Sequence, residues 1–324
     1  MPDISLMGAT YSDVPGVELP TSGGGTAYFV DTSSDTVTAS ALSQGVTAHN
    51  AAGEPIIGTG SIGGGGAFDL GEYNNSGSHN AVYRGKSLGS SVTAAQLAAI
   101  ADGSFDDLFI GDYWTVPITI GGTTTNEIFY AADCNYLLNT GISGQEVLTP
   151  HLLVVSDGCL GEGLMYNSVT TASGYAGAPL RSNNAGTTMR AIRDAIETAF
   201  GSNHILRYYD TLSNATSDGK VTGITEVEVY IEMMSEAMVY GSQWFEAQAT
   251  GSGLPTTQYT KKTQLSLFRY RPDLISCLQT YWLQNPTSNG TFARVNGAGR
   301  TYCANANTKA GIRPYFLLYG GTNE

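Results

Sequence analysis

Residues 279–319 read QTYWLQNPTSNGTFARVNGAGRTYCANANTKAGIRPYFLLY, two apolar runs that bracket a long polar segment. The runs, Tyr281–Leu283 and Ile312–Tyr319, are rich in aromatic and aliphatic residues that favour strands. Pro314 stands near the start of the second run, where its missing N–H does least harm. No acidic residue occurs in the whole stretch. We therefore expect two strands that hold a polar surface between them.

The polar segment itself is dominated by Asn, Ser, Gly, Tyr and Arg. Asn, Ser and Gly form adaptable hydrogen bonds while Tyr and Arg supply contact area, which is typical of recognition surfaces. An ordinary polar loop has the same composition, so the residue types leave both interpretations open. The candidate binding residues are Tyr281, Gln284, Asn285, Ser288, Asn289, Thr291, Arg294, Asn296, Arg300, Tyr302, Asn305 and Asn307, above a core that includes Trp282, Ile312, Pro314 and Phe316.

The overall composition argues against several classes of function. The 324 residues include 41 Gly and 19 Tyr, and only 13% are charged, whereas charged residues usually make up about a quarter of a soluble domain. A net charge of −13 with only 15 Lys and Arg argues against a nucleic-acid partner, which needs clustered cations. No apolar run reaches the roughly 18 residues that membrane insertion requires. The first residues lack the basic and apolar regions of a secretory signal, so we do not expect export by that route.

No set of residues with catalytic or metal-binding spacing stands out. The four histidines are scattered and form no pair at ligand spacing. Asp106, Asp107 and Asp112 flank an expected strand, and we interpret them as a solvated edge in preference to a general acid or a calcium site. Gly85–Ser87 resembles the end of a phosphate-binding loop but lacks the glycine that should precede it. We expect no catalytic residue, no metal and no cofactor.

The cysteines and tryptophans each allow two interpretations. Cys134, Cys159, Cys277 and Cys303 are widely separated, and we interpret them as free, buried or incidental thiols, with a disulfide between two of them as the alternative. Each of the three tryptophans adjoins another aromatic residue. Core packing is the preferred interpretation of these pairs, and a sugar-stacking platform is the alternative.

A glycine-rich stretch, Ser61–Gly66, predicts a flexible hinge that divides the chain into residues 1–65 and 66–324. In the first part the pattern predicts a strand over Thr26–Asp31 and a hairpin over Val46–Gly60. A module of this size buries little apolar surface. We therefore expect it to need a partner or to associate with itself.

The second part mixes helices and strands without a regular βαβ alternation, which indicates an α+β fold. Apolar spacing and end signals predict three helices, and β-rich runs with a Gly-Gly turn predict strands. The expected helices are Thr93–Asp102, Thr187–Phe200 and Thr225–Tyr240, and the expected strands are Phe105–Ile120, Asn126–Ala131 and Leu152–Ser156, with Gly121–Gly122 as a hairpin turn.

Two sets of motifs resemble phage structural proteins. Val37–Ala39, Leu42–Gly45 and Ile57–Gly58 match a repeat in the N-terminal modules of tail- and head-fibre proteins of phages that infect Firmicutes. The rest of the chain resembles a C-type-lectin-like domain, similar to the target proteins of diversity-generating retroelements. The motifs that carry this second resemblance are FDDLFIGDYW at Phe105–Trp114, LFRYRPDLI at Leu267–Ile275, YWL at Tyr281–Leu283 and GIRP at Gly311–Pro314.

In those target proteins the segment between the aromatic motif and the Gly-Ile/Val-Arg-Pro motif carries a variable binding face. This chain has Gln284 where the family often has Arg, and it lacks the Glu-Pro-Asn motif of calcium-dependent sugar binding. The resemblance implies a non-enzymatic protein of the virion surface, assembled in the cytoplasm of the host bacterium. It also implies that residues 1–65 contact other virion proteins and form a homotrimer or another homo-oligomer, while the second domain binds a bacterial surface receptor, a glycan or a protein.

Two other functions remain open at this point. An architectural capsid decoration or head fibre would stabilise the particle without binding a receptor. A polysaccharide-cleaving virion enzyme is the third possibility, and the lack of a convincing carboxylate pair counts against it.

Overall fold

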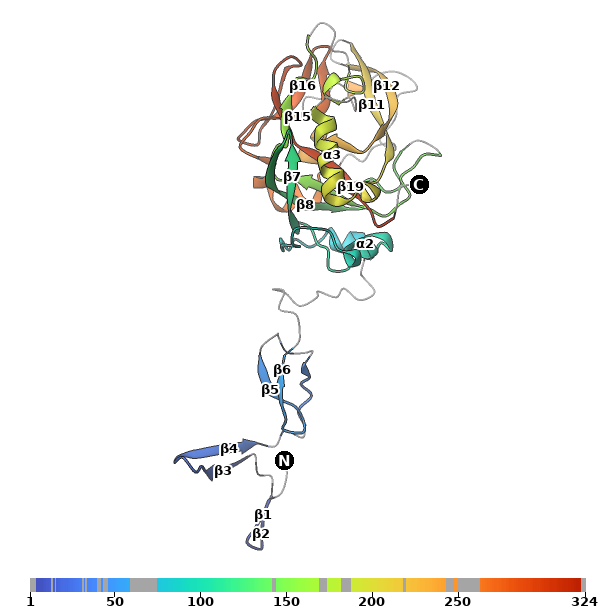
Figure 1. The fold of residues 1–324 in the computed structure, drawn as a ribbon. Helices are drawn as coiled ribbons and strands as arrows, with labels where there is room; N and C mark the ends of the chain where they lie inside the picture. Colours follow the sequence, from blue (N-terminus) through green and yellow to red (C-terminus); the bar gives the residue numbers. More distant parts are fainter. Residues whose placement is uncertain are drawn as a thin grey trace. The chain divides into compact units, whose positions relative to one another are not determined.

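The computed structural model describes residues 4–12, 14, 16–30, 32, 34–39, 42, 46–58, 75–141, 144–168, 174–181, 188–217, 220–242, 248–249 and 263–321. The chain divides into two compact units, Met1–Phe68 and Asp69–Glu324 (Figure 1). This division falls close to the boundary that the glycine-rich stretch predicts. The hinge itself, Ser61–Gly66, and Trp244 lie outside the described residues.

The first unit consists of short antiparallel hairpins, which confirms the strand expected from Thr26 and the hairpin expected after Val46. The pairs are β1 (Ile4–Leu6) with β2 (Ala9–Tyr11), β3 (Gly16–Pro20) with β4 (Thr26–Val30), and β5 (Thr47–His49) with β6 (Pro55–Ile57). No hydrophobic residue described in this unit is buried, and Tyr11, Tyr28 and Ile57 are all more than half exposed. Isolated hairpins are marginally stable in water, and the described residues of this unit supply no buried hydrophobic core.

The second unit is built on a five-stranded antiparallel sheet with the order β13-β19-β9-β8-β7. Its strands are β7 (Tyr113–Ile120), β8 (Thr123–Cys134), β9 (Leu152–Ser156), β13 (Ile231–Met233) and β19 (Pro314–Leu318). Every residue of β9 and β19 is buried, which marks the centre of the core. Gly121 and Gly122 connect β7 to β8 with φ of 59° and 82°, the left-handed conformation that a tight hairpin turn needs.

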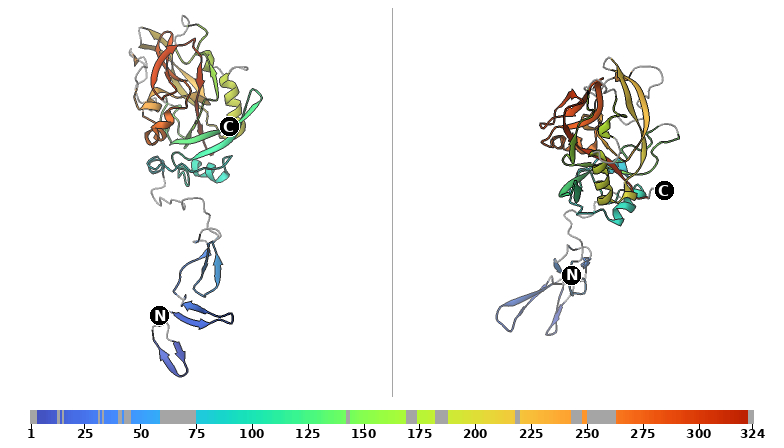
Figure 2. Two further views of the ribbon diagram at one scale, coloured as in Figure 1. Left: turned by 90° about the vertical axis from the view of Figure 1, so that its left-hand side faces the viewer. Right: turned by 45° about the horizontal axis from the view of Figure 1, so that its top comes forward.

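Helix α3 (Thr188–Phe200) packs against β7 and confirms the second expected helix (Figure 1, Figure 2). Its last residue, Phe200, contacts the rings of Trp114, Phe129 and Phe316 edge-on, with centroids 6.2, 5.1 and 4.9 Å away. The other helices are α1 (Ser76–His79), α2 (Ala94–Ala101), α4 (Glu236–Tyr240), α5 (Ser266–Tyr270) and the short 3-10 turns η3 (Pro179–Arg181), η4 (Ser202–His204) and η5 (Pro272–Ile275). Helix α2 begins at the expected cap, Thr93.

Two further sheets complete this unit. One has the order β10-β18-β15-β16-β17 and the other the order β11-β12-β14. Their strands are β10 (Gly161–Gly163), β11 (Tyr208–Ser217), β12 (Lys220–Val229), β14 (Gln248–Ala249), β15 (Tyr281–Ser288), β16 (Thr291–Val295), β17 (Thr301–Asn305) and β18 (Ala310–Ile312). The polar segment between the two apolar runs is therefore mostly strand and not an open loop.

Two sequence-based assignments are wrong. Residues 225–240 form the end of β12, then β13, and only their last turn is helical, as α4. The β-branched residues in this stretch alternate, and pairing of β12 with β11 outweighs the helical spacing of the apolar residues. The strand expected from Phe105 begins only at Tyr113, because Phe105, Asp107 and Gly111 have φ of 57°, 51° and 83° and form turns instead.

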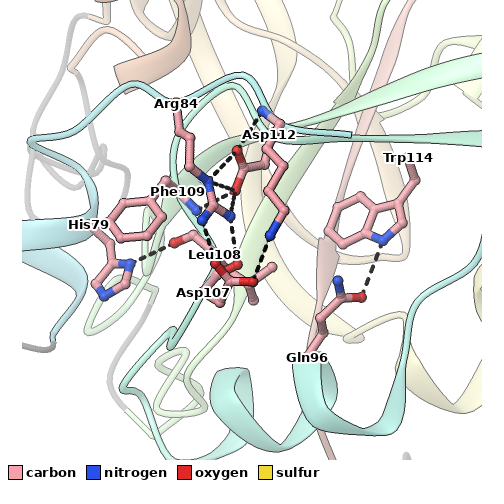
Figure 3. Close-up of polar contacts among 9 residues, drawn as sticks. His79, Arg84, Gln96, Asp107, Leu108, Phe109, Asp112 and Trp114 are labelled. Carbon is pink, nitrogen blue, oxygen red and sulfur yellow. Dashed lines mark hydrogen bonds and ion pairs between the residues drawn. The ribbon is translucent and has the colours of Figure 1, made fainter. Parts of the chain in front are cut away.

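A buried ion cluster holds the turns before β7 in place, and Figure 3 shows Arg84 between two carboxylates. The Arg84 Nε lies 3.0 and 3.1 Å from the two carboxylate oxygens of Asp112, and its Nη1 bonds Asp107. Asp112 is fully buried and also accepts the backbone N–H groups of Lys86 and Phe109, both at 2.9 Å. The interpretation of Asp112 as part of a solvated edge is therefore wrong.

We expect Asp112→Asn to lower the free energy of unfolding by about 2–3 kcal/mol, because the change removes the fully buried carboxylate that accepts from Arg84 and leaves Arg84 with Asp107 alone. Denaturant unfolding followed by tryptophan fluorescence measures this loss. Asp106→Asn is the matched control, since Asp106 is exposed, and we expect a change within about 0.5 kcal/mol. Equal losses in the two variants would contradict the assignment.

Candidate functional site

The candidate site is the antiparallel meander of β15, β16 and β17. The strand register places Trp282 opposite Arg294, and Arg294 opposite Tyr302. Residues directly opposite each other share one face of a sheet. The Arg294 guanidinium accordingly lies between two rings, 4.8 Å from the Trp282 centroid and 4.7 Å from the Tyr302 centroid. Trp282 is fully buried and donates its indole N–H to the Gly163 carbonyl at 2.9 Å, which confirms its place in the core.

The environment of Arg294 is unusual for a cation. Only 7% of the residue is exposed, and its Nε is buried without a hydrogen-bond partner. Arg294 forms no ion pair with any carboxylate of the described residues. Burial without a carboxylate partner lowers the pKa of the Arg294 guanidinium. The two aromatic faces therefore supply most of the stabilisation that an acid would otherwise provide.

Burial divides the predicted binding residues into three groups. The exposed group is Asn289, Arg300, Asn305 and Asn307; the half-buried group is Gln284, Ser288, Thr291, Asn296 and Tyr302; the buried group is Tyr281, Asn285 and Arg294. The buried group does not present side chains to the surface, contrary to our expectation. The Tyr281 hydroxyl donates to the Ile275 carbonyl at 2.9 Å, and the Asn285 side chain accepts the backbone N–H of Glu236 at 2.7 Å.

Gln284 and Tyr302 lie within β15 and β17, and the other exposed and half-buried residues lie at two separate ends of the meander. The turn after β15 lies against the turn after β17, because the Ala306 N–H donates to the Gly290 carbonyl at 2.8 Å. This contact brings together Ser288, Asn289, Thr291, Asn305 and Asn307, which we call the amide end. Asn296 and Arg300 lie in the turn between β16 and β17, about 14 Å away at the rise of a β-strand.

The amide end has hydrogen-bonding capacity that the protein does not use. The side chains of Asn289, Asn305 and Asn307 are exposed and make no hydrogen bond to any described residue. The hydroxyls of Ser288 and Thr291 lie beside them and bond each other at 2.5 Å. Three amides, each with two N–H donors and a carbonyl acceptor, are thus available to a ligand.

A second polar cluster lies inside the second unit and was not predicted from the sequence, because Glu232 falls in the stretch assigned to a helix and its partners are distant in the sequence. Glu232 is fully buried and accepts the Tyr175 hydroxyl and the Arg181 Nε, the latter at 2.6 Å. Nearby Asp210 accepts the Thr211 N–H at 2.7 Å. Burial, with a smaller effect from the Glu232 charge, raises the pKa of Asp210 to about 7. The Glu232 cluster is closed by its own partners, so we interpret it as structural.

Comparison of the chain with protein-family models, with curated proteins and with solved structures finds no match. The described part of the chain contains no group of three or more metal-ligating side chains and no helix long and apolar enough to cross a membrane. All four cysteines are free thiols, as expected, with Cys134 buried and Cys303 exposed. The function must therefore be argued from the geometry of the meander itself.

The stack around Arg294 predicts an energetic coupling between Arg294 and Tyr302. In a double-mutant cycle with Arg294→Met and Tyr302→Leu, we expect a coupling of about 1–2 kcal/mol in unfolding free energy, because the pair is desolvated. Arg207 and Tyr230 serve as the control pair, with a centroid distance of 4.9 Å and an exposed arginine. We expect at most about 1 kcal/mol there. A coupling near zero for the Arg294 pair would contradict the role of the stack.

The raised pKa of Asp210 predicts a pH dependence of stability. An unfolded Asp titrates near pH 4, so the folded protein retains a proton that the unfolded chain has lost between about pH 4 and 7. Stability from this group therefore falls as pH rises through that window and is constant above it. Asp210→Asn should remove this decline in urea-unfolding free energies measured from pH 4 to 8, whereas Asp106→Asn should retain it. Parallel curves for Asp210→Asn and wild type would refute the shift.

Proposed function

We propose that the chain is a non-enzymatic surface protein of a phage virion, of the fibre or decoration type, that binds the host surface through the amide end. The observation that carries the proposal is the set of three exposed asparagines, Asn289, Asn305 and Asn307, whose amides have no partner among the described residues. Unused amides on rigid strand ends are suited to a ligand with many hydroxyl groups. A surface glycan is such a ligand, and it is the receptor class that we favour over a protein.

The charge of the site supports an uncharged ligand. Every side chain of the amide end is neutral, and the nearest cation in sequence, Lys309, pairs with Glu162 at 2.7 Å. Arg294, which could attract an anion, is buried beneath the face. Hydrogen bonds to neutral hydroxyls contribute only modestly each, so we expect weak binding at a single site.

The first unit supports the proposed attachment and self-association. Its apolar side chains Tyr11, Leu19, Tyr28 and Ile57 are exposed to water, and no described hydrophobic residue of this unit is buried. Association with virion proteins, or with further copies in a homotrimer or another homo-oligomer, would remove them from water. Several copies on one particle would also convert weak sites into tight attachment through avidity.

The C-type-lectin-like fold of the second unit is part of the proposal. In the family that the chain resembles, an aromatic motif and a Gly-Ile/Val-Arg-Pro motif bound the variable face. Here Tyr281 of the first motif pairs directly with Gly311 of the second, in parallel register. Strands β16 and β17 lie between the two motifs in the sequence, and this position supports the proposal that they carry the display surface.

Removal of the three free amides tests the proposal. We expect full-length protein carrying Asn289→Ala, Asn305→Ala and Asn307→Ala to lose Firmicute cell binding by at least about tenfold, the sum of three modest hydrogen bonds. Its unfolding free energy should change by no more than about 0.5 kcal/mol per position, because the side chains make no internal contact that is lost. Retention of fluorescent protein on cells measures binding, and Thr119→Ala with Thr124→Ala, an exposed pair on the β7–β8 hairpin, is the control.

An architectural protein or an enzyme would give results different from those expected of a receptor-binding protein. Full retention by the triple variant would place any receptor site elsewhere. Absence of binding by wild type, together with loss of particle integrity when the gene is deleted, would support an architectural decoration. Release of reducing ends from host glycans by the purified protein would instead indicate an enzyme.

A further inference from the structure

Two cysteines that are far apart in the sequence meet beside strand β18, which pairs with the first strand of the meander. Cys159 lies between β9 and β10, and Cys277 lies between η5 and β15. Their sulfur atoms are 3.6 Å apart although the residues are separated by 118 positions. Both side chains are half-buried and neither forms a disulfide. The two sulfur atoms are in van der Waals contact and lie beyond the S–S bond length of about 2.05 Å.

A buried arginine fastens the two cysteine-bearing segments to each other. Arg313 is fully buried and donates its Nε to the Ser156 carbonyl at 2.8 Å. Its Nη1 donates to the carbonyls of Leu274 and Ile275, at 2.8 and 3.2 Å. Ser156 ends the strand that leads to Cys159, and Ile275 ends the turn that leads to Cys277. The hydrogen bonds of Arg313 therefore hold the two cysteine-bearing segments close to each other.

A glycine leaves the space that the thiols occupy. Gly311 of β18 lies beside them, and a Cβ atom at this position would overlap the Cys159 sulfur and lie 3.1 Å from the Thr280 carbonyl. Strand β18 is held between β10 and β15, so it cannot move away to make room. Any residue larger than glycine would displace Cys159 from Cys277.

A small molecule can approach the pair, because Cys277 is only half-buried and Cys159 lines a pocket that Cys277 itself does not line. An open pocket of about 620 Å³ is lined by Cys159, Thr280 and Gly311, and on its other side by Ile118 and Glu127. The hydrogen bond with Cys159, and then the charge of Arg313, lower the pKa of the Cys277 thiol. A more acidic thiol supplies more of the thiolate, which is the form that attacks a disulfide.

We propose that Cys159 and Cys277 form a reversible dithiol site that reacts with low-molecular-weight disulfides. The Cys277 thiolate attacks one sulfur of the small disulfide, forms a mixed disulfide and releases one small thiolate. Cys159 then loses its proton and attacks the Cys277 sulfur, which forms the Cys159–Cys277 bond and releases the second small thiolate. The two protein thiols are oxidised, the small disulfide is reduced to two thiols, and the protons pass to these products through solvent.

The bond would join the segment before β15 directly to the end of β9, so it would fix the base of the meander to the central sheet. This inference does not depend on the proposed receptor binding. The thiol chemistry and the amide end use different residues, and each can fail without the other.

The test uses the full-length protein with oxidised glutathione as the probe, followed by alkylation of the remaining thiols and non-reducing peptide mapping. We expect one cross-linked peptide, Cys159 with Cys277, while Cys134 and Cys303 are alkylated. Cys159→Ser should accumulate the Cys277–glutathione adduct, and Cys277→Ser should react little at Cys159. Closing a loop of this length should raise the midpoint of thermal unfolding by at least about 5 °C.

Gly311→Ala provides a test that leaves both thiols in place, because it should retain glutathionylation of Cys277 and lose the cross-link. If Gly311→Ala does not fold, the two serine variants, which are close in size to cysteine, decide the outcome. The proposal is overturned if wild type forms no cross-link while Cys277 is glutathionylated. It is equally overturned if the exposed Cys303 is the only thiol that reacts.

Discussion

The buried guanidinium of Arg313 is the interaction on which the second unit depends. It joins the end of β9 to the η5 turn through three carbonyl contacts, and its planar face lies 5.5 and 5.4 Å from the ring centroids of Phe268 and Tyr281. The central sheet and the meander sheet are thereby held at one point. A buried cation costs several kcal/mol unless its donors and charge are compensated. Here three carbonyl contacts to Nε and Nη1 and two aromatic rings take the place of a carboxylate, while Nη2 is buried without a hydrogen-bond partner.

Only 13% of the residues are charged, and the charges of the buried and partly buried arginines are stabilised in two ways. Arg84 pairs with Asp107 and Asp112, whereas Arg294 and Arg313 lie against aromatic rings without an ion pair in the described structure. The planar guanidinium allows stacking that an ammonium group could not match. The side chains of the amide end, Ser288, Asn289, Thr291, Asn305 and Asn307, are all neutral, which is why we propose an uncharged ligand there.

The meander combines a rigid base with unoccupied polar tips. Its strands pack their apolar residues inward, and Trp282 and Phe292 are almost completely buried. The side chains of Asn289, Asn305 and Asn307 at the amide end make no hydrogen bond to a described residue. In the opposite turn, Asn296 accepts the backbone N–H groups of Ala298 and Arg300, both at 3.0 Å. Binding of a ligand to such a surface would cost little backbone conformational entropy, because the strands already fix the backbone. The adjacent dithiol would act on the base and leave the tips unchanged.

The sequence alone determined the elements whose signals are local. Thr93 caps α2, the apolar spacing before Phe200 predicts α3, and Gly121–Gly122 predicts the β7–β8 turn, since each depends on residues within one or two turns of the chain. The mixture of helices and strands of an α+β protein also followed from local patterns, whereas the binding face stays a prediction. These signals act through hydrogen bonds and dihedral angles that neighbours in sequence control.

Only the tertiary structure decided which residues of that face are available and which meet. Residues 225–233 carry helical spacing yet become strand, because pairing with β11 and β19 satisfies their backbone and buries their apolar side chains. Arg294 enters the core because the register places it between Trp282 and Tyr302. Gly290 meets Ala306, and Cys159 meets Cys277, through contacts between segments that are distant in the sequence. Such contacts depend on how sheets pack, and composition near each residue carries no signal for them.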